Sequence, residues 1–262
     1  MARTLRDEAK QVIASPQPQF RRPVAMASSV VSDEVRAQIH GVIETPFHHL
    51  TEALANPERW CAVLILHINN KACRVTSGSD GAPRVALKVA RKYDQPVEDA
   101  YDLDFAYHVI ERTHDLLSVQ LDAPSGPMGT SDYSIRLDAT PLDTRTALRL
   151  SYAYRQGAMT AAAMDLYLST VGRGKVGFTT VENASAGDAQ FIGGVRGLME
   201  RNLMRYFLAV DAAATHPPGS GPDVFGRRLR LWFDSTEAYP RQLHEVDRAT
   251  YLELKRGLAP RS

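Results

Sequence analysis

The sequence lacks long hydrophobic runs and an excess of charge of either sign. No apolar stretch approaches the roughly 20 residues that a membrane-spanning helix needs, so no transmembrane segment is predicted. Lys and Arg total 31 against 30 for Asp and Glu, which leaves no net field to attract a polyanion. The basic cluster of Arg227, Arg228 and Arg230 is interleaved with apolar residues, as is typical of the solvated face of an amphipathic helix. Nucleic acid is therefore not an expected partner.

Cysteine is scarce as well. Cys61 and Cys73 fit no CxxC pattern, so they are either two free, half-buried thiols or one disulfide. A bridge would tie the end of a helix to a neighbouring strand and would indicate an oxidising compartment. The first 30 residues contain no continuous apolar stretch, so no secretory signal is expected. We expect a cytoplasmic protein if the chain is complete, and a periplasmic or secreted one if a signal peptide was removed and the cysteines are bridged.

The motifs of common catalytic and metal sites are missing. The sequence has no GxSxG, no HExxH and no phosphate-binding GxxxxGK[ST]. His48 and His49 are adjacent on a predicted helix, where their side chains diverge by about 100° and cannot easily hold one ion. Asp102, Asp104 and His108 share a strand face that is expected to be solvated. We predict no catalytic residue, no metal and no cofactor, and the sequence leans away from an enzyme.

What the sequence does contain is a clear succession of periodic patterns. After an N-terminal arm over residues 1–30, which starts with a short helical pattern, strict alternation predicts a strand from Glu34. Short helices follow near residues 46–54 and 57–66. Six further strands are predicted at 71–77, 84–92, 102–112, 115–122, 131–140 and 146–155. Helical patterns then cover 158–171 and 195–214, and two short helices follow a linker at 216–223.

This order, and the segment ETPFHHLTEALANPERWCAVL that leads into the first two helices, resembles the START-like or Bet v 1-like superfamily. The resemblance covers about residues 34–214. It implies an α+β helix-grip fold, in which a curved antiparallel sheet of about seven strands packs around a long C-terminal helix and encloses a pocket for apolar molecules. We expect a START-like domain over 31–215 with a helical insertion at about 158–194, and a linker and C-terminal helical extension over 216–262 that packs on this domain.

The resemblance and the inward-facing pattern together select the expected pocket residues. They are Leu87, Phe105, Tyr107, Tyr133, Ile135, Tyr152, Met199, Asn202, Leu203 and Tyr206. Plain core packing is the alternative for each of them. An inward Asn202 needs a hydrogen-bond partner, either a ligand headgroup or a neighbouring backbone or tyrosine group. Arg196 and Glu200, four residues apart on the same helix, are expected to form a surface ion pair.

Three functions remain open. The first is binding, with or without transfer, of an apolar or amphipathic molecule such as a lipid, a sterol-like compound or a polyketide. The second is a polyketide cyclase or aromatase on the same fold, in which buried ionisable groups move protons. The third is a protein-interaction module with a vestigial cavity. Few inward-facing ionisable side chains are predicted, which favours the first function. Transient membrane contact and the oligomeric state stay open.

Overall fold

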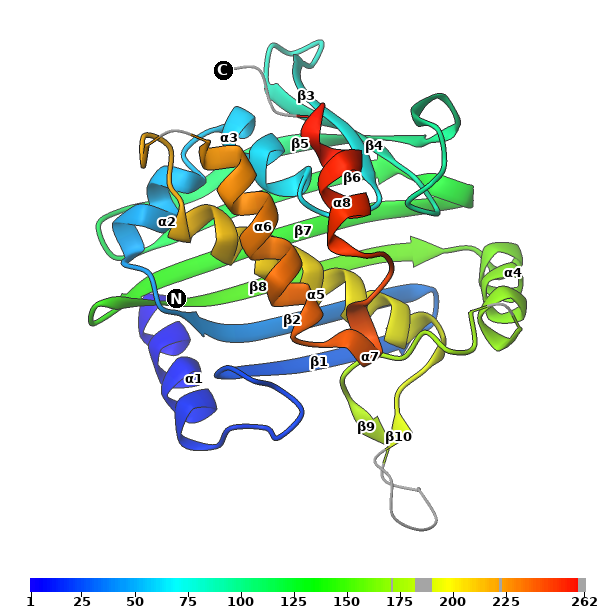
Figure 1. The fold of residues 1–262 in the computed structure, drawn as a ribbon, viewed down its shortest axis with the longest axis horizontal. Coiled ribbons are helices and arrows are strands. Elements are labelled where there is room, and N and C mark those ends of the chain that lie inside the picture. Colours follow the sequence, from blue (N-terminus) through cyan, green and yellow to red (C-terminus); the bar gives the residue numbers. More distant parts are fainter. Residues whose placement is uncertain (171, 182–189, 222, 259–262) are drawn as a thin grey trace.

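The protein is described by a computed structural model over residues 1–170, 172–181, 190–221 and 223–258 (Figure 1). Its strands are β1 (Val24–Val31), β2 (Glu34–Ile43), β3 (Asn70–Ser77), β4 (Pro83–Val89), β5 (Tyr101–Arg112), β6 (Leu117–Ser125), β7 (Thr130–Leu142), β8 (Arg145–Gln156), β9 (Thr180–Val181) and β10 (Gln190–Phe191). Its α-helices are α1 (Ala2–Ala14), α2 (Phe47–Ala53), α3 (Pro57–Leu64), α4 (Ala158–Ser169), α5 (Gly194–Thr215), α6 (Val224–Glu237), α7 (Pro240–Leu243) and α8 (Arg248–Arg256). Short 3-10 turns are η1 (Val97–Asp99) and η2 (Pro127–Gly129).

Eight strands form one antiparallel sheet in the order β1-β2-β8-β7-β6-β5-β4-β3. The predicted α+β helix-grip fold is confirmed, with the long helix α5 lying across one face of the curved sheet (Figure 1). The sheet has one strand more than expected. β1 lies in the segment predicted as an irregular arm, and it was missed because this edge strand is only partly buried and shows no regular alternation.

The long helix approaches the sheet closely at its C-terminal half. A side chain at Gly41 on β2 would place its Cβ only 2.7 Å from the ring of Phe207, so glycine allows α5 to settle against the strand. On the other side of α5, the indole Nε1 of Trp232 in α6 donates a hydrogen bond to the Arg205 carbonyl at 2.9 Å. The Trp232 ring in turn stacks on Tyr251 of α8. The helix is thereby buried between the sheet and the C-terminal helices.

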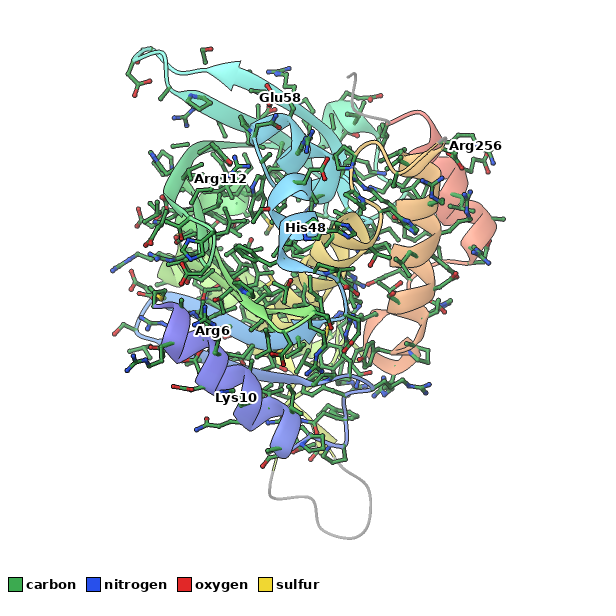
Figure 2. The ribbon with its side chains drawn as sticks, turned by 90° about the vertical axis from the view of Figure 1, so that its left-hand side faces the viewer. Arg6, Lys10, His48, Glu58, Arg112 and Arg256 are labelled. Carbon is green, nitrogen blue, oxygen red and sulfur yellow. A yellow bond between two sulfur atoms is a disulfide. The ribbon has the colours of Figure 1, made fainter. Side chains whose placement is uncertain are left out.

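Two segments tie peripheral elements to this core. A disulfide joins Cys61 on α3 to Cys73 on β3, with their Cα atoms 5.3 Å apart, which is the bridged one of the two alternatives left open above. On the opposite face of the sheet from α6 and α8, helix α1 buries Leu5 (Figure 2). There the Glu8 carboxylate pairs with Nδ1 of His40 on β2 at 2.9 Å. Both faces of the sheet are therefore partly covered.

Two polar residues expected at the surface are buried. Arg228 on α6 is not on a solvated face, because its Nε donates to the His216 carbonyl at 2.8 Å and fixes the chain before α6. Glu200 is fully buried and forms no surface pair with Arg196. Its carboxylate accepts from the backbone N–H groups of Phe178 and Thr179 at 2.7 and 2.9 Å. Such contacts come from distant chain segments, which helical spacing alone does not reveal.

Of the predicted insertion at 158–194, the structure describes α4 and the short pair β9 and β10, whereas 171 and 182–189 lie outside the described residues. No helix in the described part of the chain is long and apolar enough to cross a membrane.

Candidate functional site

A cavity of about 990 Å³ lies between the sheet and the N-terminal half of α5. Its walls come from the end of β4 and the following loop, from η2, from β7 and β8, from the inner face of α4, and from α5. Asp99 of η1, Leu103 of β5, the turn between α3 and β3, Lys175 and Glu245 complete the lining. The cavity is thus at the end of the sheet where α4 lies (Figure 1).

Four tyrosines form one wall of the cavity. Tyr133 on β7 stacks on Tyr154 of β8 with ring centroids 5.2 Å apart, and Tyr152 meets Tyr206 of α5 edge to face at 6.2 Å. Tyr152 and Tyr154 share a sheet face because they are two residues apart on one strand. Between Ser131 and Ser134 the register of β7 against β8 shifts, and Tyr133 lies at this irregularity. The wall presents aromatic carbon together with hydroxyl groups.

These phenols are neutral around pH 7. Burial raises the pKa of Tyr206 to about 12 and raises those of Tyr152 and Tyr154 as well. The hydroxyl of Tyr133 is hydrogen-bonded to Oγ1 of Thr130 at 2.7 Å. A bound molecule would therefore meet tyrosine hydroxyls that can both donate and accept hydrogen bonds.

His67 lies at the inner end of the cavity and is only 3% exposed. Its ring centroid is 4.8 Å from that of Tyr206, and its Nδ1 accepts from the backbone N–H of Asn69 at 3.2 Å. Burial, followed by the charges of Arg205 and Lys255, lowers the pKa of His67 well below its usual value, although Asn202 acts in the opposite direction. The ring is therefore neutral, and because Nδ1 accepts, its hydrogen is on Nε2.

Two arginines on successive turns of α5 share one carboxylate at the cavity wall. Nη2 of Arg201 and Nη2 of Arg205 donate to the same oxygen of Glu245, at 2.5 and 2.9 Å. Each guanidinium also donates to a backbone carbonyl, that of Gln242 for Arg201 and that of Leu243 for Arg205. Glu245 thus orients both arginines from the loop after α7.

The structure brings four of the expected pocket residues together. Tyr133, Tyr152, Asn202 and Tyr206 line the cavity, and Asn202 does so on the same face of α5 as the two arginines. The other six do not line it and are buried in the hydrophobic core: Leu87, Phe105, Tyr107, Ile135, Met199 and Leu203. The reason is that α2 and α3 cover part of the inner sheet face, while α5 presses its apolar stripe against the strands.

The charged residues of the cavity were not foreseen. The expectation of few inward ionisable groups is wrong, because His67, Arg201, Arg205 and Glu245 all line it. A signal was present in α5, where Leu198, Arg201, Asn202, Arg205 and Tyr206 recur at helical spacing and so mark one face. Charged residues are rarely buried, so the sequence pattern alone does not predict that these arginines face a cavity. Within the described ranges, no group of three or more His, Cys, Asp or Glu residues is placed to hold a metal ion.

No protein-family profile matches the chain, and no curated protein matches its sequence. Solved structures do match its fold. They include TTHA0849 from Thermus thermophilus, with 12% identity over 70% of this chain and 97% of the other at a TM-score of 0.44. A START superfamily protein from Mycobacterium smegmatis has 14% identity over 56% and 92% at 0.34, and the Zhui aromatase/cyclase from Streptomyces has 12% over 76% and 94% at 0.35.

These structures include the kinds of protein that the sequence resembles. The class is defined by the structure itself, which is an α+β helix-grip protein with a cavity between the sheet and its long helix.

Proposed function

We propose that this protein binds an amphipathic small molecule in the cavity between the sheet and α5, and that it holds or transfers this molecule. The observation that carries the proposal is the cavity itself, about 990 Å³ in volume. This is at the upper end of the range of ligand pockets, and a few convergent polar groups among aromatic carbon are typical of such sites. The volume is also hard to reconcile with an interaction module whose cavity is vestigial.

Helix α4 supports exchange of the molecule with the surroundings. Its inner face lines the cavity, while Met159 and Leu166 on its outer side are exposed. Among the residues of α4, only Leu168 is buried. A helix held by so few buried contacts can move at a modest free-energy cost. We expect the ligand to pass beside α4.

A second function, catalysis on a bound substrate, is favoured by one specific observation. His67 is a neutral imidazole in the cavity wall next to the phenol of Tyr206. The Nε2–H of a neutral imidazole and the hydroxyl of a phenol can both donate hydrogen bonds to a substrate oxygen on which negative charge develops, and such donors stabilise an enolate-like transition state. This arrangement is compatible with a cyclase or aromatase.

Native mass spectrometry of the purified protein, followed by solvent extraction, tests the first function. We expect a stoichiometric organic molecule, or its uptake when the protein is exposed to a lipid and metabolite extract. Ala163→Trp, on the cavity side of α4, should reduce occupancy, whereas Ala162→Trp on the same helix, which does not line the cavity, should leave it unchanged. A clean protein mass after exposure, in every variant, would contradict the proposal.

The same extract separates binding from catalysis. If the protein only binds, the molecule recovered after prolonged incubation has its original mass and connectivity. If the protein is an enzyme, the molecule is converted, and His67→Gln slows the conversion while the substrate still binds. Conversion at the same rate by His67→Gln would remove the case for His67 as a catalytic hydrogen-bond donor.

A further inference from the structure

Positive charge exceeds negative charge inside the cavity. Arg201 and Arg205 are nearly inaccessible, with side chains 4% and 3% exposed, yet they share the single carboxylate of Glu245. Lys175 lies 3.9 Å from the other oxygen of the same carboxylate. Three cations therefore meet one anion. Charges at the cavity rim do not correct this, because the exposed residues Arg91 and Lys92 are matched there by Asp94 and Asp99.

Several hydrogen-bond donors at the same place have no acceptor. Within the described part of the chain, Arg205 donates only through Nη2, so its Nη1 makes no hydrogen bond and its buried Nε has no partner. Nε of Arg201 is also buried and unpartnered among the described residues. Buried donors are normally satisfied, and each one that is not destabilises the protein. An acceptor that also carries negative charge would satisfy these donors and balance the surplus cations.

From this surplus of cations and donors we infer that the ligand is an amphipathic organic anion, whose carboxylate or similar group faces Arg205 and whose apolar body lies against the tyrosine wall. The inference rests on the proposed function and adds the charge of the ligand to it. Arginine suits this role because its guanidinium stays charged in a partly buried site and binds carboxylates through several N–H groups. The four tyrosines, which have no formal charge around pH 7, suit the apolar body.

A pair of fluorescent probes that differ in one anionic group tests the inference. 8-Anilinonaphthalene-1-sulfonate and N-phenyl-1-naphthylamine share the same ring system, and only the first carries a sulfonate. Both become fluorescent in apolar surroundings, so their Kd values are measured in the same titration format at pH 8. The measured quantity is the ratio of the two Kd values, which cancels changes in cavity shape that affect both probes.

In Arg205→Met we expect the sulfonate probe to lose affinity relative to the neutral probe by about tenfold or more, since a desolvated charge partner is removed. Lys175→Met, with a side chain 33% exposed, should shift the ratio in the same direction by about threefold. Arg248→Met is the control, because it removes an equal charge from an exposed side chain on α8 that does not line the cavity. It should leave the ratio unchanged.

The outcomes separate the two proposals. If the neutral probe binds and the ratio is the same in wild type, Arg205→Met and Lys175→Met, the anionic ligand is excluded while the cavity remains a binding site. If neither probe binds the wild-type protein, the proposed function fails and the inference fails with it. Should Arg205→Met not fold, as judged by circular dichroism and thermal unfolding, the Lys175→Met ratio against that of Arg248→Met decides the question.

Discussion

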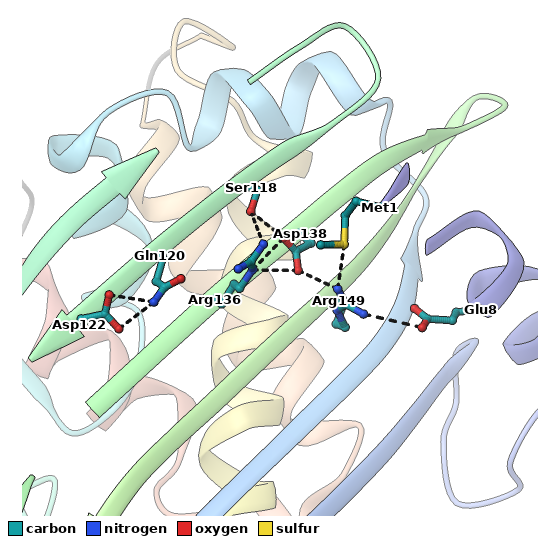
Figure 3. Close-up of polar contacts among 8 residues, drawn as sticks. All are labelled: Met1, Glu8, Ser118, Gln120, Asp122, Arg136, Asp138 and Arg149. Carbon is teal, nitrogen blue, oxygen red and sulfur yellow. Dashed lines mark hydrogen bonds and ion pairs between the residues drawn. The ribbon is translucent and has the colours of Figure 1, made fainter. Parts of the chain in front are cut away.

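The two faces of the sheet each carry a pair of arginines around one shared carboxylate, but their charges balance differently. On the outer face, beneath α1, Asp138 of β7 accepts from Arg136 and Arg149 (Figure 3). Arg149 also lies 3.7 Å from Glu8 of α1, so two cations meet two anions. On the inner face, Arg201, Arg205 and Lys175 meet only Glu245.

In the outer cluster, both oxygens of Asp138 accept hydrogen bonds. The hydroxyl of Ser118 donates to Asp138 at 2.7 Å, and Nη2 of Arg136 donates to that hydroxyl at 3.1 Å. Ser118 and Arg149 lie directly opposite Asp138 on the neighbouring strands, so the pleat itself brings the three together. The protein alone therefore accounts for the charges and hydrogen bonds around Asp138. The surplus of cations around Glu245 has no such partner within the described residues, and this difference is the basis for the anionic ligand inferred above.

The largest expected effect comes from breaking the outer cluster. Asp138→Asn leaves two arginines without their shared carboxylate and should lower the free energy of unfolding by about 2 to 3 kcal/mol, less than for a fully buried pair because both arginines are partly exposed. Urea unfolding measures this change. The ratio of probe affinities should stay the same, and an altered ratio would mean that the two clusters are not independent.

The free energy of unfolding measured at acid pH gives a second test of the role of Asp138. Burial alone would raise the pKa of Asp138, but hydrogen bonds from Ser118, Arg149 and Arg136 outweigh it and hold the pKa below its usual value. The native carboxylate thus contributes stability that is present above the unfolded-state pKa of about 3.9 and is lost as the pH falls through the lower native value. Asp138→Asn should flatten this part of the stability profile.

His67, on the inner face, should make stability depend on pH in a higher pH range than Asp138 does. Because the pKa of His67 is lowered in the folded protein, the unfolded chain binds a proton below about pH 6.5 that the native state does not bind. Stability should fall with decreasing pH, by at most about 1.4 kcal/mol per pH unit for one proton. His67→Asn should reduce this slope, to which the lowered pKa values of His40 and His216 also contribute, and His114→Asn, at an exposed turn, should not. An unchanged slope in His67→Asn would assign it to another group.

Removing one arginine from each cluster tests the comparison directly. Arg149→Met on the outer face breaks a balanced network and should lower the free energy of unfolding by about 1 kcal/mol. Arg205→Met removes one of three cations that share a single carboxylate and should raise the free energy of unfolding by about 1 kcal/mol, because residues of a binding site are often not optimal for stability. Chemical denaturation measures the free energy of unfolding of both variants. If both lose the same amount, the inner cluster has only a structural role.

The smallest effect concerns the attachment of α1. Glu8→Gln removes the charge that pairs with His40 and Arg149 and should destabilise the protein by about 0.5 kcal/mol. Hydrogen exchange in α1 should become faster, whereas Asp7→Asn, at an exposed position on the same helix, should have no effect. If exchange in α1 does not change, the apolar contacts of Leu5 hold the helix without help from Glu8.

The sequence predicted most of the fold, because alternation and helical spacing are local signals. The strands from β2 to β8 and helix α5 were found this way, whereas β1 has too little regular burial to produce a pattern. The cavity was predicted only in part. Tyr133 and Tyr152 follow from alternation, but the burial of Arg205 depends on Glu245, which folds back from 40 positions further along the chain. No local rule connects two such residues.

Because of the close contact at Gly41, the two halves of the long helix differ in how well they tolerate substitutions. From Phe207 to Ala214 every residue of α5 is buried, so substitutions there would lower the stability of the whole fold. Leu198, Arg201 and Asn202, one to three turns earlier, face the cavity. Selection, or a designer, can therefore change ligand preference at one end of the helix while the other end keeps the protein folded.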